Sequence, residues 1–102
     1  MIQLQVKHLK GFEEQLVGLI GAKSASPVLL RTRFGIHTFG MSFPIDVVIL
    51  DKKRKVVRVV EALKPNRIFV WSPRFDTVLE LPIGTVRKYS LKVGSLIHLE
   101  LL

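Results

Sequence analysis

The sequence predicts a mainly β domain (α+β by a strict count), barrel-like or two-sheet, with six to eight short strands and one or two short helices. Three observations indicate this fold. Short apolar segments with strand-like patterns recur along all 102 residues, and they do not alternate with helices as in a doubly wound sheet. A small chain with many strands also leaves the fewest open edges when its sheet closes on itself. The length corresponds to a single domain, residues 1–102, and the 48% hydrophobic content excludes a disordered chain.

The first part of the chain is expected to hold a strand, a helix and a loop. Residues 2–7 alternate between apolar and polar side chains, which predicts a half-buried strand. Starting at Phe12, apolar residues recur at i, i+4, i+7 and i+8, and Gly21 is a natural stop, so we expect a helix over 12–20. Residues 23–27 form a loop by composition.

The middle of the chain predicts a β-hairpin and two shorter strands. Residues 28–31 and 36–39 are expected to be short strands on either side of a bend near Gly35. An apolar run, a charged turn at 51–55 and a β-branched run together predict a hairpin over 45–63. Its first strand is apolar on both faces, as is typical of an interior strand.

The last third of the chain predicts three more elements and a short helix between them. Residues 67–71 are a short strand candidate, and residues 77–81 alternate as a strand does. Pro82 suits the first position of a short helix over 82–89. Residues 95–101 alternate cleanly and predict the final strand.

The net charge of +8, from 16 basic and 8 acidic residues, is concentrated in one segment. Residues 1–51 carry 5 − 4 = +1, whereas residues 52–67 alone carry 7 − 1 = +6. A local basic excess attracts phosphate, nucleic acid or another acidic surface, although the tip of a hairpin is often charged simply because it is solvated. The residues expected to form an anion-binding surface are Lys52, Lys53, Arg54, Lys55, Arg58 and Arg67.

Two aromatic residues follow this basic segment and have two interpretations. Alternation places Arg67, Phe69 and Trp71 on one face, and basic residues interleaved with aromatics resemble a platform on which nucleic-acid bases stack. The same aromatics could instead belong to the core and leave Ile68 and Val70 outward. We favour the core, because large aromatics dominate the cores of small domains.

Composition and motifs exclude several classes of protein. Cysteine is absent, so disulfides and thiolate metal sites are impossible. The first ten residues lack the pattern of a signal peptide, and the longest uncharged run is too short and polar to span a bilayer, which predicts a soluble cytoplasmic protein without a membrane partner. Low Asn and Gln usage indicates a thermophilic source. No catalytic or cofactor-binding fingerprint occurs, so we expect no cofactor, and enzyme activity and oligomeric state stay open.

A group of polar residues is embedded in otherwise apolar segments. The group consists of Arg31, Arg33, His37, Asp46 and Glu80. Arginine offers bidentate donors to phosphate or carboxylate, and histidine acts as an acid, a base or a ligand. The leading hypothesis is therefore a cleft that binds a small polar or anionic ligand. The plain alternative, which we favour for the arginines, is that one of them pairs with Asp46 or Glu80 to satisfy a partly buried polar cluster.

Two pairs within this region could also carry metal or acid–base chemistry. Asp46 and Glu80 could be an acid–base pair or ligands of a hard metal, but one salt-bridged and one solvated carboxylate is the favoured interpretation. His37 and Met41 could be a soft metal pair, yet two ligands are too few to predict a metal site. A binding domain for a small ligand thus ranks first, a basic accessory module second and a metal-dependent enzyme last.

Several segments resemble the family called domain of unknown function 192 (DUF192). Residues 35–51 and 78–84 are similar to its two signature segments. Residues 63–65 and 91–95 match its mid-chain proline and its closing turn, and the resemblance runs from about residue 18 to residue 99. It implies a small, mainly β domain of unestablished function.

The chain also departs from the pattern of that family. Residues 18–22 lack an arginine common in its early Gly-Leu-Met segment, and Asn66 stands where an aromatic residue often follows the proline. Asp46 and Glu80 match both variants of the family's pattern, whereas His37 matches only one. The resemblance therefore weakens a catalytic role for His37.

Overall fold

The computed structural model describes residues 2–9, 26–33 and 35–102. In these residues the chain forms, in order, β1 (Ile2–His8), β2 (Val28–Arg31), β3 (Ile36–His37), β4 (Ile45–Leu50), β5 (Val56–Leu63), β6 (Ile68–Phe69), β7 (Thr77–Pro82), α2 (Thr85–Lys88) and β8 (Ile97–Leu101). The mainly β class is confirmed. The helix expected over 12–20 lies outside the described residues.

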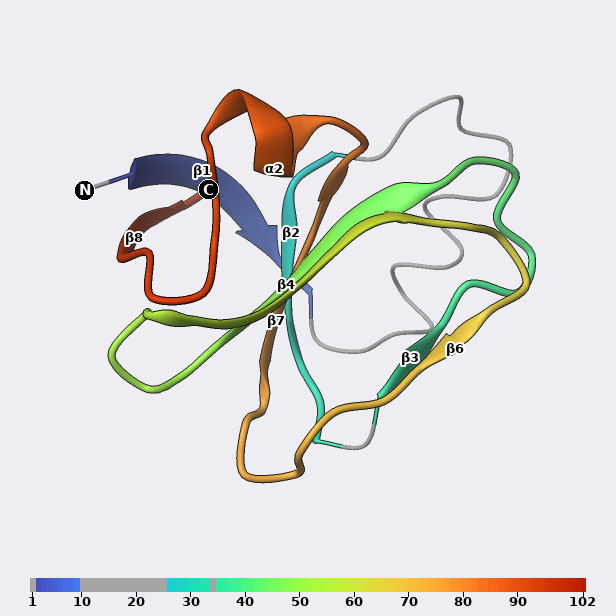
Figure 1. Ribbon diagram of the computed structural model, residues 1–102, viewed down its shortest axis with the longest axis horizontal. Coiled ribbons are helices and arrows are strands. Elements are labelled where there is room, and N and C mark those ends of the chain that lie inside the picture. Colours follow the sequence, from blue (N-terminus) through green and yellow to red (C-terminus); the bar gives the residue numbers. More distant parts are fainter. Residues whose placement is uncertain (1, 10–25, 34) are drawn as a thin grey trace.

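Six strands form one curled sheet in the order β5-β4-β7-β2-β1-β8 (Figure 1). Strand β1 is parallel to both β2 and β8, and the other neighbours are antiparallel. The two edges approach each other where β5 begins: the Val56 amide donates to the Ser95 carbonyl at 2.8 Å, and the Ile97 amide donates to the Arg54 carbonyl at 3.0 Å. The sheet is therefore a half-barrel, and the predicted barrel-like fold is confirmed.

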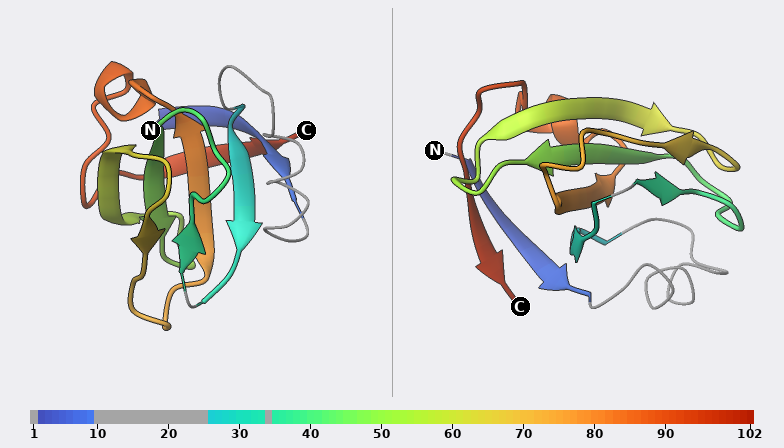
Figure 2. Two further views of the ribbon diagram at one scale, coloured as in Figure 1. Left: turned by 90° about the vertical axis from the view of Figure 1, so that its right-hand side faces the viewer. Right: turned by 90° about the horizontal axis from the view of Figure 1, so that it is seen from below.

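A second, two-stranded sheet pairs β3 with β6 and lies against one face of the large sheet (Figure 2). The side chains between the two sheets form an outer core, which includes Ile36, Ile45, Val47, Ile49, Phe69, Trp71 and Val78. The concave side of the half-barrel holds an inner core, which includes Leu4, Val6, Leu29, Val48, Leu50, Leu79, Leu81, Val86 and Ile97. Strands β4 and β7 are covered on both faces, so all their residues except the half-buried Pro82 are buried, Asp46 and Glu80 included.

The hairpin predicted over 45–63 is present as β4 and β5. In its turn, the Asp51 carboxylate accepts hydrogen bonds from the amides of Lys53 at 2.8 Å and Lys55 at 2.9 Å. The hydrogen bond from Lys55 is the main reason why the pKa of the Asp51 carboxyl lies below its usual value. Near the far end of β5, the register shifts by a bulge, and Ala62 has a φ of +54°.

The strands predicted over 36–39 and 67–71 are each reduced to two residues, Ile36–His37 and Ile68–Phe69. Next to this pair, the buried Thr38 hydroxyl donates to the Lys64 carbonyl at 2.6 Å and accepts from the Arg67 amide at 2.9 Å. The Thr38 amide also donates to the Arg67 carbonyl at 2.8 Å, so the two segments stay joined one residue beyond the short strands.

The aromatic residues of this segment belong to the core. Phe69 and Trp71 are 9% and 7% exposed, whereas Ile68 and Val70 are 68% and 60% exposed. The Trp71 indole N–H donates to the Phe75 carbonyl at 2.8 Å, which satisfies its one polar group. The prediction that these aromatics belong to the core is confirmed. The hypothesis that bases stack on them is wrong, because both side chains are buried.

The helix predicted over 82–89 is shorter than expected, since only Thr85–Lys88 is helical. Pro82 still belongs to β7, where it is in register with Ile45, and Gly84 follows with a φ of +90°. In the described part of the chain, no helix is long and apolar enough to cross a membrane.

Gly35 is expected to tolerate no side chain. Its φ is +134°, and a Cβ added there would lie 2.6 Å from the Phe69 carbonyl oxygen. We expect Gly35→Ala to lower the free energy of unfolding by about 2 kcal/mol, because it combines backbone strain with a backbone clash. Chemical denaturation measures the loss.

Gly94→Ala is the matched control for this substitution. Gly94 also has a positive φ, +97°, but a Cβ there would meet no atom within 4 Å. This variant should lose clearly less stability than Gly35→Ala, because it has strain without a clash. Equal losses in the two variants would contradict the role assigned to the contact with Phe69.

Candidate functional site

Arg31 and Arg33 meet at one carboxylate. A guanidinium nitrogen of each lies 3.7 Å from Oδ2 of Asp76, and Arg33 also donates to the Pro73 carbonyl at 3.1 Å. The Thr32 amide donates to the Asp76 carbonyl at 3.0 Å and so holds the two segments together. The sequence predicted that one of these arginines pairs with Asp46 or Glu80. That prediction is wrong, because their acidic partner is Asp76.

Asp46 is 1% exposed and holds together two elements of the fold. Its Oδ1 accepts from the Ala62 amide and its Oδ2 from the Val86 amide, each at 2.9 Å. The first hydrogen bond stabilises the bulge in β5, and the second fixes the start of α2. The carboxylate therefore has a structural role within the half-barrel.

Glu80 is also 1% exposed but lies on the other face of the sheet. It is in register with Val28 and Val47, and both side chains belong to the outer core. Its carboxyl oxygens have no hydrogen-bond partner among the residues that the structure describes. Burial raises the pKa of Glu80 to about 8, because the charged form is poorly solvated there.

The interpretation of Asp46 and Glu80 as one salt-bridged and one solvated carboxylate is wrong, because both are buried. Asp46 is in register with Leu81 of the inner core, so the two carboxyl groups point to opposite faces of the sheet. This arrangement gives no geometric support to an acid–base pair or a shared metal. Within the described ranges, no group of three or more His, Asp or Glu side chains could hold a metal ion.

His37 is half-buried in β3, opposite Ile68. Its Nδ1 accepts from the Phe39 amide at 3.3 Å, and its ring centroid lies 5.1 Å from that of Phe39. Met41 is buried in the outer core. The structure thus brings Arg31 and Arg33 together and places His37, Asp46 and Glu80 elsewhere; ligand binding by these five residues stays a prediction.

Strand pairing gathers basic residues at one end of the large sheet. Arg31 is in register with Thr77, and Thr77 is in register with Leu50. Strands β2 and β4 therefore end where β5 and β7 begin. The segments 31–33, 51–55 and 72–76 adjoin these strand ends; in Figure 1, residues 31–33 and 72–76 lie at the lower edge and the 51–55 turn lies at the left.

We call this region the basic end. Its cations are Arg31, Arg33, Lys52, Lys53, Arg54, Lys55 and Arg74, and its acids are Asp51 and Asp76, so its formal charge is 7 − 2 = +5. Both carboxylates are already engaged, one by backbone amides and one by the two arginines. All seven cationic residues except the half-buried Arg54 are exposed.

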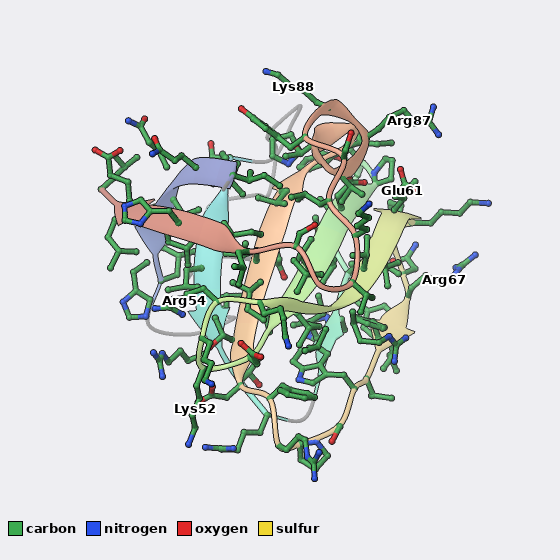
Figure 3. All side chains as sticks on the ribbon, turned by 60° about the vertical axis from the view of Figure 1, so that its left-hand side comes forward. Lys52, Arg54, Glu61, Arg67, Arg87 and Lys88 are labelled. Atoms are coloured by element: carbon green, nitrogen blue, oxygen red, sulfur yellow. The ribbon has the colours of Figure 1, made fainter. Side chains whose placement is uncertain are left out.

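The expected anion-binding set is therefore divided. Lys52, Lys53, Arg54 and Lys55 belong to the basic end, whereas Arg58 and Arg67 lie near β6. The Arg58 guanidinium carbon stands 5.0 Å from the centroid of the Phe69 ring. Figure 3 shows Lys52 and Arg54 on one side of the molecule and Arg67 on the other.

Sequence reasoning found the cations of the hairpin and the two arginines, but it treated them as separate sites. It missed Arg74 and Asp76, which lie in the loop before β7. A pairing of β2 with β7 would have revealed them, because it places residue 76 beside residue 32.

Comparison with known proteins establishes the family. The model of DUF192, described as "Uncharacterized ACR", matches residues 2–99. The chain belongs to the DUF192 family. The resemblance noted in the sequence is thus confirmed, and the function of the family is uncharacterised.

Three curated relatives are UPF0127 proteins of thermophilic archaea, in line with the thermophilic source that the composition indicates. The protein of Pyrococcus abyssi is 39% identical over 66 residues, which are 63% of this chain and 56% of that protein. The protein of Thermococcus kodakarensis is 30% identical over 100 residues, 91% and 63% of the two chains, and that of Pyrococcus furiosus is 27% identical over 99 residues, 91% and 84%. The chain thus spans less than two thirds of the first two.

Two crystal structures share the fold of this DUF192 chain. One is a protein of unknown function from Novosphingobium aromaticivorans, with a TM-score of 0.68 and 16% identity over 90% of this chain and 70% of that one. The other, from Sinorhizobium meliloti, is named as a candidate transcription regulator and has a TM-score of 0.69 and 18% identity, over 87% and 76% of the two chains. At this identity the likeness shows the fold alone.

Proposed function

We propose that this DUF192 domain binds the phosphate backbone of nucleic acid through its basic end. The observation that supports the proposal is the gathering of seven cationic side chains against two engaged carboxylates at one end of the sheet. Lysine and arginine that neutralise phosphates release condensed counterions, and this release drives sequence-independent binding.

The distribution of the cations favours an extended anion over a small one. They come from three separate segments, and β7 lies between β2 and β4. Two strand spacings separate the outer segments by about 10 Å, so the basic end spans several phosphate charges of a duplex, which carries one per about 1.7 Å. The proposed contacts are to phosphate rather than to base edges, and we expect little sequence preference.

The proposal combines two sequence-based hypotheses. The hairpin cations were expected to bind nucleic acid or another acidic surface, and Arg31 and Arg33 were expected to bind an anion. They now contribute to one surface, whose role in binding stays a proposal. The cytoplasmic location also stays a prediction.

The salt dependence of binding tests the proposed function. We would measure the affinity of the full chain for a short, labelled DNA duplex by fluorescence anisotropy at increasing salt. The logarithm of the binding constant should fall with the logarithm of the salt concentration with a slope of about −4 to −6. The double variant Lys52→Ala/Lys53→Ala should reduce the steepness of that slope by about 2.

Arg87→Ala/Lys88→Ala is the matched control, since it removes the same charge from α2. Both residues lie far from Lys52, at the opposite end of the molecule in Figure 3. We expect this variant to bind DNA with the slope of the parent chain. An absence of binding at low salt, or equal weakening in the two double variants, would overturn the proposal.

A further inference from the structure

A groove of about 810 Å³ lies between β1, β8 and α2, away from the basic end. Its volume falls in the range of small-molecule sites, about 300–1,000 Å³. The polar side chains that line it are Gln3, Gln5, Lys7, Ser26, Thr85, Lys88, Tyr89 and Glu100. None of them belongs to the residues predicted from the sequence to bind a ligand.

The strand pattern explains why β1 offers a polar wall. Leu4 and Val6 belong to the inner core, so the alternate residues Gln3, Gln5 and Lys7 project from the other face of the strand. Gln5 is in register with Glu100 of β8, which adds a carboxylate to the same face. This wall therefore combines amide groups with one positive and one negative charge.

The opposite wall comes from α2 and the residue that follows it. Val86 is buried, and its amide is held by Asp46, so the position of this short helix is fixed from inside the half-barrel. Lys88 and Tyr89 line the groove, and the Lys88 ammonium nitrogen lies 5.3 Å from the centroid of the Tyr89 ring. The ammonium group thus lies over one face of the aromatic ring.

In the described residues, the charged groups of Lys7, Lys88 and Glu100 form no ion pair, and the Lys88 ammonium lies over the Tyr89 ring. Leu4, Pro27 and Pro82 add apolar surface to the lining. Two ammonium groups beside apolar surface favour a ligand with an anionic group and an apolar body, because each part then finds a matching contact.

We propose that this groove binds a small organic oxyanion, a carboxylate or phosphate ester with an apolar body. Lys7 and Lys88 contact the anionic group, and Tyr89 contacts the apolar body. Gln5 and Glu100 accept hydrogen bonds from a hydroxyl or amine of the ligand, and the Glu100 carboxylate disfavours polyanions at this site. The proposal goes beyond nucleic-acid binding and does not depend on it.

NMR titration of the full ¹⁵N-labelled chain tests the groove. The probes are phenyl phosphate, benzoate, inorganic phosphate and benzylamine. We expect phenyl phosphate and benzoate to shift the amides of Gln5, Tyr89 and Glu100. Phenyl phosphate should bind more tightly than inorganic phosphate, which lacks the apolar body, and cationic benzylamine should not bind.

Two double variants complete the test. Lys7→Ala/Lys88→Ala should weaken phenyl phosphate binding by about tenfold or more. Lys52→Ala/Lys53→Ala, which alters only the basic end, should leave that affinity unchanged. Shifts confined to the basic end, equal binding of benzylamine, or an unchanged affinity in the first variant would overturn the proposal. None of these results depends on whether the protein binds DNA.

Discussion

Replacing Asp46 by alanine is expected to lower the free energy of unfolding by about 4 kcal/mol, because each buried donor left without an acceptor costs about 1–3 kcal/mol. The carboxylate accepts from the amides of Ala62 and Val86, and the residue is 1% exposed. Both amides would lose their acceptor, and the bulge in β5 and the start of α2 would lose their common support. Urea denaturation measures this loss.

Asp51→Ala is the control for this prediction. Asp51 likewise accepts from two backbone amides, those of Lys53 and Lys55, but it lies in a solvated turn. Water can replace its carboxylate there, so the loss should be much smaller. Asp46→Asn, which keeps the shape and one acceptor oxygen, should fall between the two alanine variants. Equal losses for Asp46→Ala and Asp51→Ala would contradict the structural role of Asp46.

The stability of the protein is expected to fall as the pH rises from about 4.5 to about 8, because of Glu80. Burial raises the pKa of this carboxyl from 4.5 to about 8 in the folded chain. In that range the unfolded chain is ionised and the folded chain is protonated, so unfolding releases a proton and rising pH favours it. The contribution of protonated Glu80 to stability is complete below the pKa that this carboxyl has in the unfolded chain. It is lost as the pH rises through the pKa of the same carboxyl in the folded chain. The slope from this group is at most about 1.4 kcal/mol per pH unit.

Glu80→Gln isolates this effect, since glutamine has a similar shape and no titratable group. We expect the variant to lose the slope between pH 4.5 and 8 and to be more stable than the parent chain at pH 8. Urea denaturation across this range measures both. Glu100→Gln, at an exposed position, is the control and should keep the parent profile. If the parent chain and Glu80→Gln show the same pH dependence of stability between pH 4.5 and 8, the raised pKa of Glu80 is contradicted.

Local sequence patterns were sufficient to predict strands whose two faces are both buried. Strand β4 is apolar along its length except at Asp46, and this pattern correctly predicts an interior strand with both faces covered. The turn after it is charged because it is solvated, which is also a local property. Residues 36–39 and 67–71 were less predictable, because only two residues of each form a strand and the contacts beside them join Thr38 to Lys64 and Arg67, 26 and 29 positions along the chain.

The polar residues show the limit of such patterns most clearly. The sequence indicates that Asp46 and Glu80 are unusual in apolar strands, but it does not show the face on which each lies. The partners of Asp46 are 16 and 40 residues away, and the acid that joins Arg31 and Arg33 precedes a strand that only pairing places beside β2. Two amide donors give Asp46 a structural role, whereas burial raises the pKa of Glu80; the neighbours of each residue make the difference.

The sequence by itself determined the mainly β class, the central hairpin, the family resemblance and the concentration of positive charge in residues 52–67. These properties follow from the order and period of side chains along the chain. Only the tertiary structure decided that four of those cations join Arg31, Arg33 and Arg74 at one end of the sheet, and that β1, β8 and α2 enclose a groove. The reason is physical: sheet order brings together residues that are distant in sequence, and the period of a strand does not specify its neighbours.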